Sequence, residues 1–394
     1  MVFTVASVFL LVLPTDAVHR DTSFQLSDTC PKSFVKQTNG TCTFKHRYQS
    51  YQPPTRFANL HAPLPRARDG FTPQQIALGT LLFFDPLLSA DRTVSCAHCH
   101  HPDLGFADGR GQSMGKGGRG VGPERTGGTL LPRSAPSLWN VGFLDRLFLD
   151  NRAASLEEQA EGPLFSDVEM GNTPAGLAGT LNESAIYRRL FEEAFNLSVG
   201  ESITIDLVIN ALVAFQGTLI SLDSQFDRYV FGDESALNEE QKWGYELFHS
   251  FATRCANCHI PPLFTDGLLS AIGAPEPAGK SFDPGAGGLN GDISLNGAFR
   301  NSPLRNIVKT APYMHSGGEP DLLEAVKFYN KEPGHALPVG ERVLVHWMIF
   351  RGPSWTARDA DALVALLEAL TDESLMPKIP TEVPSGLPVV RRLP

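Results

Sequence analysis

Apolar residues recur at helical spacing in four segments of the chain. The spacing predicts helices at residues 72–83, 201–222, 237–248 and 355–370. Thr72 is a good N-cap, and Pro73 suits the first helical position that follows it. No part of the chain is rich in strand signals. The pattern therefore predicts an all-α fold.

A separate apolar run occupies residues 2–13, and a small residue, Ala17, follows it closely. The run is shorter than the roughly 20 residues that a membrane-spanning helix needs. We interpret residues 1–17 as a secretory signal peptide, the alternative being a buried N-terminal strand. No other segment is long and apolar enough to cross a membrane. The sequence therefore predicts a periplasmic protein without an integral membrane anchor.

The composition sets broad limits on this picture. A chain of 394 residues with 42% hydrophobic residues suits two or three folded domains. The 36 glycines and 30 prolines predict long irregular loops. A net charge of −10 argues against nucleic acid as a partner, because such binding needs clustered Lys and Arg.

The six cysteines fall into two groups. Cys30 and Cys42 stand apart from the others, and in an exported protein they either form a disulfide or remain two thiols. The other four cysteines lie in CAHCH at 96–100 and CANCH at 255–259. The second group therefore needs its own explanation.

Both five-residue strings match the pattern for covalent attachment of haem c. Two thiols at this spacing bond the two vinyl groups of one haem, and the adjacent histidine binds the iron. Zinc ribbons hold their Cys pairs far closer together in sequence, and a thioredoxin-like pair needs no histidine. The motifs predict two covalent haem c groups, held by Cys96, Cys99, His100, Cys255, Cys258 and His259.

The haem motifs lie in a repeated frame. HPDLGFADG follows the first and IPPLFTDG follows the second, and residues 135–141 (APSLWNV) resemble 302–307 (SPLRNI). A duplication explains this frame, with two cytochrome c-like domains at 71–235 and 236–394 after an N-terminal extension at 18–70. The Gly-rich loop at 105–128 lacks the Ser or Thr of a phosphate-binding loop.

Three segments carry a resemblance to a known family. They are LGTLLFFDPLLS before the first haem motif, NRAASLEEQAEGPLFSDVEM after it, and RNSPLRNIVKTAPYMHSGG in the second half. They are similar to the bacterial di-haem cytochrome c peroxidase and MauG family. The resemblance implies that hydrogen peroxide reacts at haem 1 and that haem 2 transfers electrons. It implies an electron source that is either a small c-type cytochrome or a side chain of a partner protein.

Position by position, the resemblance places the catalytic pair of the family on Gln159 and Glu169, with Pro163 in the same pocket. The chemistry suits these residue types. A carboxylate can move a proton between the two peroxide oxygens, and an amide can hydrogen-bond the peroxide. The alternative is that Gln159 and Glu169 are solvated surface residues.

The resemblance also bears on the iron ligands. The gating histidine of typical peroxidases falls near Lys116, so haem 1 is expected to be open and five-coordinate, with Met114 as an alternative ligand. The second distal ligand falls on Tyr329, as in the MauG-like branch. The alternatives are a core tyrosine at this position and ligation by Met314 or His315.

Two positions depart from the family. Leu149 stands where the family has a tryptophan between the haems, and Trp139 is a hypothetical substitute. Ser134 stands where the family has an asparagine that binds calcium, while Thr310 and Pro312 match the carbonyl ligands. We still expect one calcium ion.

Two other functions remain as alternatives. A non-catalytic di-haem electron-transfer cytochrome requires both irons to be six-coordinate, which the missing histidine in the loop after the first haem disfavours. A haem-based sensor would need a signalling domain, and the sequence shows none.

Overall fold

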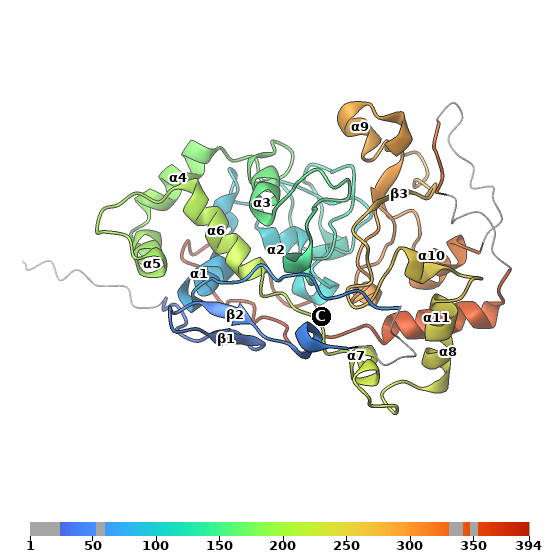
Figure 1. Cartoon of the computed structure of the whole chain (residues 1–394). Coiled ribbons are helices and arrows are strands. Elements are labelled where there is room, and N and C mark those ends of the chain that lie inside the picture. Colours follow the sequence, from blue (N-terminus) through green and yellow to red (C-terminus); the bar gives the residue numbers. More distant parts are fainter. Residues whose placement is uncertain (1–23, 53–59, 331–341, 347–353, 394) are drawn as a thin grey trace, which may run out of the picture.

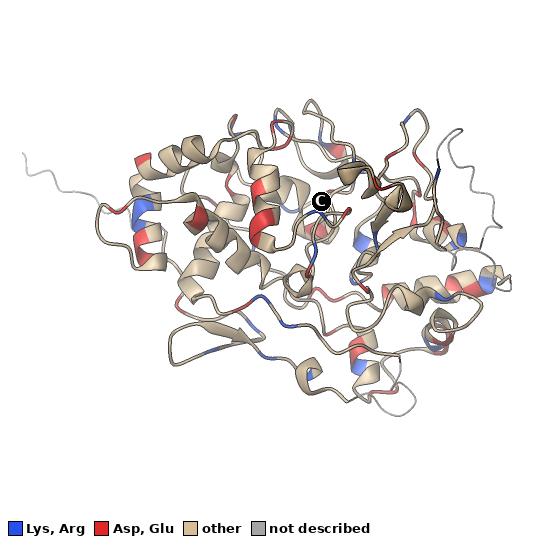
Figure 2. Cartoon of the chain, turned by 45° about the horizontal axis from the view of Figure 1, so that its top comes forward, with Lys and Arg blue, Asp and Glu red and all other residues tan. Residues whose placement is uncertain are grey.

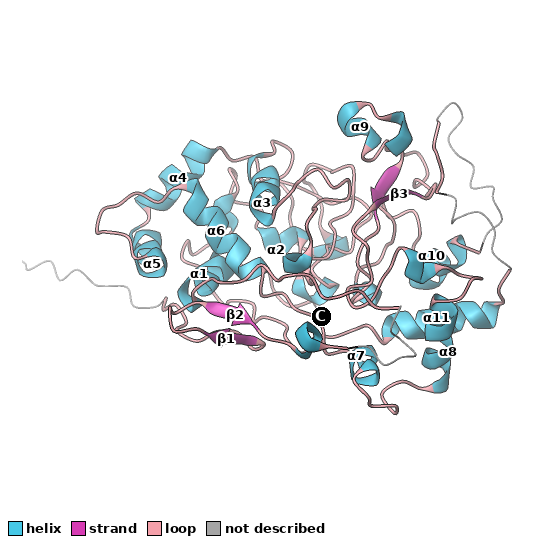
Figure 3. Ribbon diagram, viewed as in Figure 1, coloured by secondary structure: helices cyan, strands magenta, loops and turns pink. Residues whose placement is uncertain are grey.

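The computed structural model describes residues 24–52, 60–330, 342–346 and 354–393 (Figure 1). The proposed signal peptide at 1–17 lies outside the described residues. Helices dominate the described part, and the strands form only two short antiparallel pairs, so the all-α prediction is confirmed (Figure 3). The helices are α1 Pro73–Phe84, α2 Cys96–Cys99, α3 Leu156–Phe165, α4 Pro174–Glu183, α5 Ala185–Phe195, α6 Ile205–Gln216, α7 Gln225–Val230, α8 Glu239–Phe248, α9 Gly287–Asn290, α10 Leu322–Phe328 and α11 Ala357–Glu368. The strands are β1 Phe34–Lys36, β2 Cys42–Phe44, β3 Leu269–Ala271 and β4 Ala298–Arg300.

Local capping explains where the two helices before the haem motifs begin. The Thr72 hydroxyl accepts from the Gln75 amide at 3.2 Å, and the Gln75 side chain accepts from the Thr72 amide at 2.9 Å. Asn238 and Gln241 make the same reciprocal pair at the start of α8. The helices expected at 72–83 and 237–248 are thereby confirmed.

The helix expected at 201–222 is shorter in the structure, where α6 spans Ile205–Gln216. The apolar pattern continues beyond it, but the chain leaves the helix to pair with the first domain. The Asn140 amide donates to the Leu219 carbonyl at 2.7 Å, and the Ser221 amide donates to Asn140 Oδ1 at 2.9 Å. These tertiary contacts outweigh the local helical preference.

The two haem domains share one construction, in which the first helix crosses the last at a glycine. A Cβ at Gly79 of α1 would lie 1.8 Å from the Ala211 carbonyl oxygen of α6. A Cβ at Gly244 of α8 would lie 2.0 Å from the Ala362 carbonyl oxygen of α11. Only glycine permits helix axes to approach this closely. The matched crossings support the duplication that the sequence indicates.

Equivalent asparagines of the two domains both hydrogen-bond Ser221. Asn140 and Asn306 both adopt the left-handed conformation, with φ of 61° and 57°. The Asn140 amide group donates to the Ser221 carbonyl, and the Asn306 amide group donates to the Ser221 hydroxyl, each at 2.9 Å. The junction is buried, so it fixes the two domains relative to each other.

Both ends of the described chain pack across the domains. Cys30 and Cys42 form a disulfide in the N-terminal extension, as one of the two sequence interpretations expected. After α11 the C-terminal segment returns to the first domain, where Val383 and Val390 join its core. The Ser385 hydroxyl donates to Asp85 there at 2.6 Å. The domain division at residue 235 stays a prediction.

No helix in the described ranges is long and apolar enough to cross a membrane.

Candidate active site

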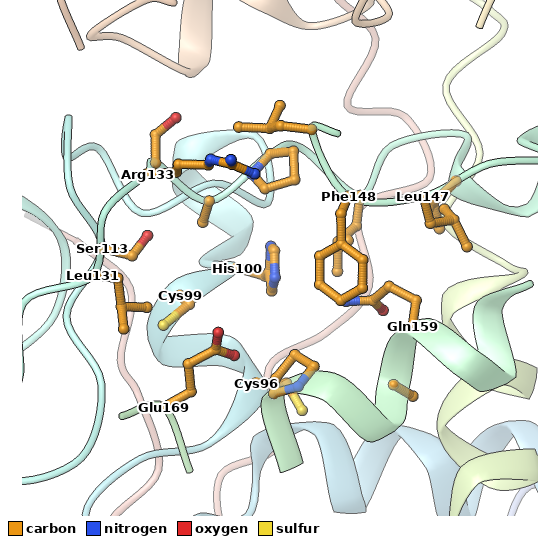
Figure 4. A pocket seen from close by; sticks show the side chains of 18 of the residues that line it. Cys96, Cys99, His100, Ser113, Leu131, Arg133, Leu147, Phe148, Gln159 and Glu169 are labelled. Carbon is orange, nitrogen blue, oxygen red and sulfur yellow. The ribbon is translucent and has the colours of Figure 1, made fainter. Parts of the chain in front are cut away.

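A cavity of about 410 Å³ lies against the first haem motif (Figure 4). Its walls come from α1, α2, α3 and α6 and from the loops around α2 and α3, with Leu289 and Arg300 from the second half of the chain. The residues expected to react or to hold haem 1 all line it: Cys96, Cys99, His100, Gln159, Pro163 and Glu169. Fold and sequence thus bring the predicted site together.

The proximal histidines are held in one orientation by a carbonyl. His100 Nδ1 lies 2.9 Å from the Phe106 carbonyl oxygen, and His259 Nδ1 lies 3.1 Å from that of Phe264. Both phenylalanines have a φ of 58°, which turns their carbonyls toward the imidazoles. When Nδ1 donates its proton to a carbonyl, Nε2 is free to bind a metal.

These observations fit two haem c groups. Cys96, Cys99, Cys255 and Cys258 are free thiols rather than disulfides. Each pair lies beside a histidine whose Nε2 is available, and burial lowers the pKa of both imidazoles, which favours the neutral form that binds iron. The residues present therefore suit covalent haem at both motifs.

The distal side of the first cavity carries the predicted reactive pair. Figure 4 shows Gln159 and Glu169 on different sides of His100, with both side-chain ends directed into the cavity. Gln159 and Pro163 lie on α3, which is N-capped by Ser155. Both residues are half-buried and line the cavity, and their catalytic role stays a prediction.

The electrostatics of Glu169 suit a proton carrier. Burial raises the pKa of its carboxyl, and the nearby Arg152 guanidinium lowers it by a smaller amount. Arg152 is itself fixed, because it bonds Asp150 at 2.8 and 2.9 Å and lies 3.5 Å from the centre of the Phe148 ring. The site therefore holds a carboxyl whose proton affinity is above that of an exposed glutamate.

The duplication relates Pro163 to Tyr329. Pro163 lies seven residues after the first residue of α3, and Tyr329 lies seven residues after the first residue of α10. The turns before these helices also match, with bridges between Leu147 and Ala153 and between Tyr313 and Glu319. Proline offers no ligating side-chain atom, whereas tyrosine offers a phenolic oxygen. The equivalence accords with one open iron and one closed iron.

Tyr329 lies next to the second haem motif. Its ring packs edge-on against Phe328 at 5.0 Å between centroids. Burial raises the pKa of its hydroxyl, and the sulfurs of Cys255 and Cys258 raise it further. Although 39% of its surface is accessible, we infer from these neighbours that the accessible part faces the space beside the motif.

Two of the three alternative ligands, Met114 and His315, make side-chain contacts of their own. The Met114 sulfur accepts from the Gly128 amide at 3.2 Å, and the side chain is buried away from the cavity lining. His315 Nε2 lies 2.8 Å from Glu276 Oε1, and its ring stacks on Phe299 at 4.1 Å. The Met114 sulfur and His315 Nε2 are thus occupied, and ligation of the second haem by Tyr329 stays a prediction.

The structure shows where Leu149 and its hypothetical substitute Trp139 lie. Leu149 lines the first cavity. Trp139 is buried and packs edge-on against the ring of Phe106 at 5.1 Å between centroids, and Phe106 is the residue whose carbonyl orients His100. The role of Trp139 as an electron route stays a prediction.

The expected calcium ligands come from segments that meet. The Ser134 amide donates to the His315 carbonyl at 2.9 Å, which brings Ser134 beside the segment that contains Thr310 and Pro312. The described ranges hold no cluster of three or more acidic, His or Cys side chains suited to a metal. An ion here would have to be held mainly by carbonyl oxygens and water.

Sequence reasoning missed the charged residues of the cavity wall. Arg133 and Arg300 both line the cavity, and they precede the repeated segments SAP and NSP. The repeat itself was the signal that could have identified them. Their burial depends on contacts between the domains, which local patterns do not reveal.

Comparison with known proteins gives consistent matches. A family model described as di-haem cytochrome c peroxidase matches residues 73–235. The methylamine utilization protein MauG of Methylorubrum extorquens is 35% identical over 81% of this chain and 84% of its own length. The cytochrome c551 peroxidase of Pseudomonas aeruginosa is 36% identical over 64% of this chain and 70% of its own length.

Solved structures agree with these relatives. A MauG-like protein associated with microbial copper homeostasis is 30% identical, with a TM-score of 0.64 over 83% of this chain and 97% of that one. The diheme peroxidase BthA from Burkholderia thailandensis is 26% identical, with a TM-score of 0.65 over 94% of this chain and 97% of that one.

Proposed function

The chain belongs to the di-haem cytochrome c peroxidase and MauG family, and we propose that it reacts with hydrogen peroxide at the cavity beside Cys96, Cys99 and His100. One observation carries this proposal. Gln159, Pro163 and Glu169 line the same cavity as the first haem motif, and Figure 4 shows the Gln159 and Glu169 side chains directed into it. A plain electron carrier has no use for a half-buried carboxyl group at that place.

The residues divide the chemistry among them. A haem bound here supplies an iron with an open coordination position and electrons for cleavage of the peroxide O–O bond. Glu169 takes the proton from one peroxide oxygen and returns it to the other, and the Gln159 amide orients the molecule. Pro163 would leave a haem iron bound here without a ligand from this position, because its ring has no donor atom.

We assign the second haem an electron-transfer role with Tyr329 as its distal ligand. The support is the position of Tyr329 after α10, which matches that of Pro163 in α3. An anionic tyrosine ligand favours oxidised iron. This feature favours a MauG-like enzyme that oxidises a side chain of a partner protein over a peroxidase that draws electrons from a small c-type cytochrome.

We further propose that the enzyme works in the periplasm. The apolar run at 2–13 suits a signal peptide, and haem c is normally attached after export. The disulfide between Cys30 and Cys42 accords with an oxidising compartment. A calcium ion held by Ser134, Thr310 and Pro312 belongs to the same proposal, and removal of calcium with a chelator should alter the haem spectra.

Replacement of Glu169 tests the central role. Glu169→Gln keeps the shape of the side chain and removes the base, so peroxide reactivity should fall by about 10²- to 10⁴-fold while both haems remain bound. The matched control is Glu161→Gln, which changes an exposed carboxyl on α3. Stopped-flow absorption after peroxide mixing measures the rate. A Glu169→Gln rate equal to that of the parent would refute the assigned role.

A further inference from the structure

We propose that Arg300, which comes from the second half of the chain, binds a propionate group of haem 1. This inference rests on the proposed attachment of haem at the first motif. Nothing in the repeat or the resemblance assigned a function to this residue.

The contacts of Arg300 leave part of its guanidinium unused. It is the last residue of β4 and only 6% exposed, and it lines the first cavity. Its backbone amide donates to the Leu149 carbonyl at 2.7 Å, and its Nη1 donates to the Arg146 carbonyl at 2.7 Å. Its Nε is buried and has no hydrogen-bond partner within the part of the chain that the structure describes.

The charges around the cavity leave Arg300 without a carboxylate of its own. Asp150 pairs with Arg133 at 2.5 Å and with Arg152 at 2.8 Å, and Asp283 pairs with Arg133 at 2.7 Å. These two carboxylates are engaged by Arg133 and Arg152, and the third carboxyl group of the cavity, Glu169, interacts with Arg152. Arg300 makes no ion pair with any described residue. A buried cation without a counter-charge is unfavourable, so the site is built for an anion.

Burial disfavours the positive charge of Arg300 while no anion is present. It lowers the pKa of the guanidinium to about 10, and Asp150 opposes that effect only in part. An anionic group entering the cavity would supply the missing charge. Arginine suits a carboxylate in particular, because its N–H groups form a planar fork.

The side of the cavity on which Arg300 lies identifies this anion as a haem propionate. Haem c carries its thioether bonds at one edge of the ring and its two propionates at the opposite edge. Figure 4 shows Cys96 and Cys99 on one side of His100 and Arg133 on the other. Arg300 lines the same cavity as Arg133, and its backbone amide bonds Leu149, the residue before the Asp150 that pairs with Arg133. This places Arg300 on the Arg133 side, at the propionate edge. Haem 1 is then held by both halves of the chain.

The experiment compares Arg300→Gln and Arg300→Lys with the parent, each as the purified protein with both haems. Arg146→Gln is the matched control, because Arg146 meets Arg300 only through its carbonyl and its own side chain is exposed. Spectroelectrochemical titration gives the reduction potential of each haem. Resonance Raman spectra report the bending bands of the propionates.

Loss of the cation should lower the potential of haem 1 in Arg300→Gln, because a positive charge beside the haem favours the reduced state. The potential of haem 2 and both values in Arg146→Gln should match the parent. Arg300→Lys should keep most of the potential but change the propionate bands.

Unchanged propionate bands and an unchanged haem 1 potential in Arg300→Gln would overturn the assignment and leave Arg300 a structural residue that caps the Arg146 carbonyl. If Arg300→Gln fails to fold, Arg300→Lys decides alone, since parent-like propionate bands there contradict the proposal. No peroxide enters these assays, so failure of the proposed peroxide chemistry would not alter their result.

Discussion

At the scale of single residues, the environment of Glu169 changes the proton affinity of its carboxyl group. Glu169 is a carboxyl placed by the chain beside the first haem motif, where burial strengthens its hold on a proton. Arg152 moderates that effect from a position fixed by Asp150 and Phe148. The balance suits a group that must accept a proton and release it again within one reaction.

This balance predicts a pH dependence. Glu169 must be ionised to accept a proton, so the rate of the peroxide reaction should fall as pH drops through its pKa. Because burial raises that pKa, the fall should begin above the 4.5 of an ordinary glutamate. Arg152→Gln should move the midpoint to still higher pH, since the Arg152 charge lowers the pKa. Stopped-flow rates recorded against pH measure both midpoints, and a midpoint that Arg152→Gln moves downward would contradict the assignment.

Tyr329 gives a second prediction at this scale. Tyr329→Phe removes the phenolic oxygen and keeps the ring, so haem 2 should lose its distal ligand and change from a low-spin to a high-spin spectrum. Haem 1 should keep the spectrum of the parent. EPR of the ferric protein measures both. An unchanged haem 2 signal would show that another atom, or none, ligates that iron.

At the scale of helices, the glycine crossings hold each domain in shape. Gly79 and Gly244 let α1 meet α6 and α8 meet α11 at backbone distance. Gly79→Ala should therefore destabilise the first domain by about 1–3 kcal/mol, because the added methyl would overlap the Ala211 carbonyl.

The matched control for this crossing is Gly179→Ala on α4, where a Cβ would meet nothing within 4 Å. That change should be neutral or stabilise by up to about 1 kcal/mol, because alanine favours helix. Thermal unfolding of the holoprotein followed by circular dichroism compares the two. Equal unfolding temperatures for both variants would mean that the crossing can relax without cost.

Local signals predicted these helices well where the helix is capped by its own residues. Thr72 with Gln75, and Asn238 with Gln241, set the starts of α1 and α8. The end of α6 escaped prediction because Ser221 turns away to meet Asn140, a residue far away in the sequence. Periodicity reports which face is apolar and does not report which distant group competes for the backbone.

Over the whole molecule, a buried ion pair ties three parts of the chain together. Arg305 bonds both carboxylate oxygens of Asp227 at 2.6 and 2.7 Å, and the Tyr48 hydroxyl of the N-terminal extension donates to the same carboxylate. Burial raises the pKa of Asp227, but the Arg305 charge and the hydrogen bonds from Arg305, Tyr48 and Ser224 together outweigh it and hold the pKa below its usual range. Such a pair fixes a unique arrangement of the extension, α7 and the second domain.

The sequence could predict the two haem motifs, their histidines and the duplication, because each depends on residues close together in the chain. It could predict Gln159 and Glu169 only through a resemblance, since nothing in their local pattern separates them from surface residues. The repeat, which pairs Arg300 with Arg133, could have drawn attention to Arg300 but not to its place in the cavity. Its burial against the first cavity depends on how the second half of the chain folds across the first.

The most direct test of the account is spectroscopy of the purified, as-isolated ferric protein. EPR and absorption spectra are recorded first, and one equivalent of hydrogen peroxide is then added without reductant. The account predicts one high-spin and one low-spin haem, with a prompt change of the haem 1 spectrum on addition of peroxide. Two low-spin haems that ignore peroxide until they are reduced would contradict the open site above His100.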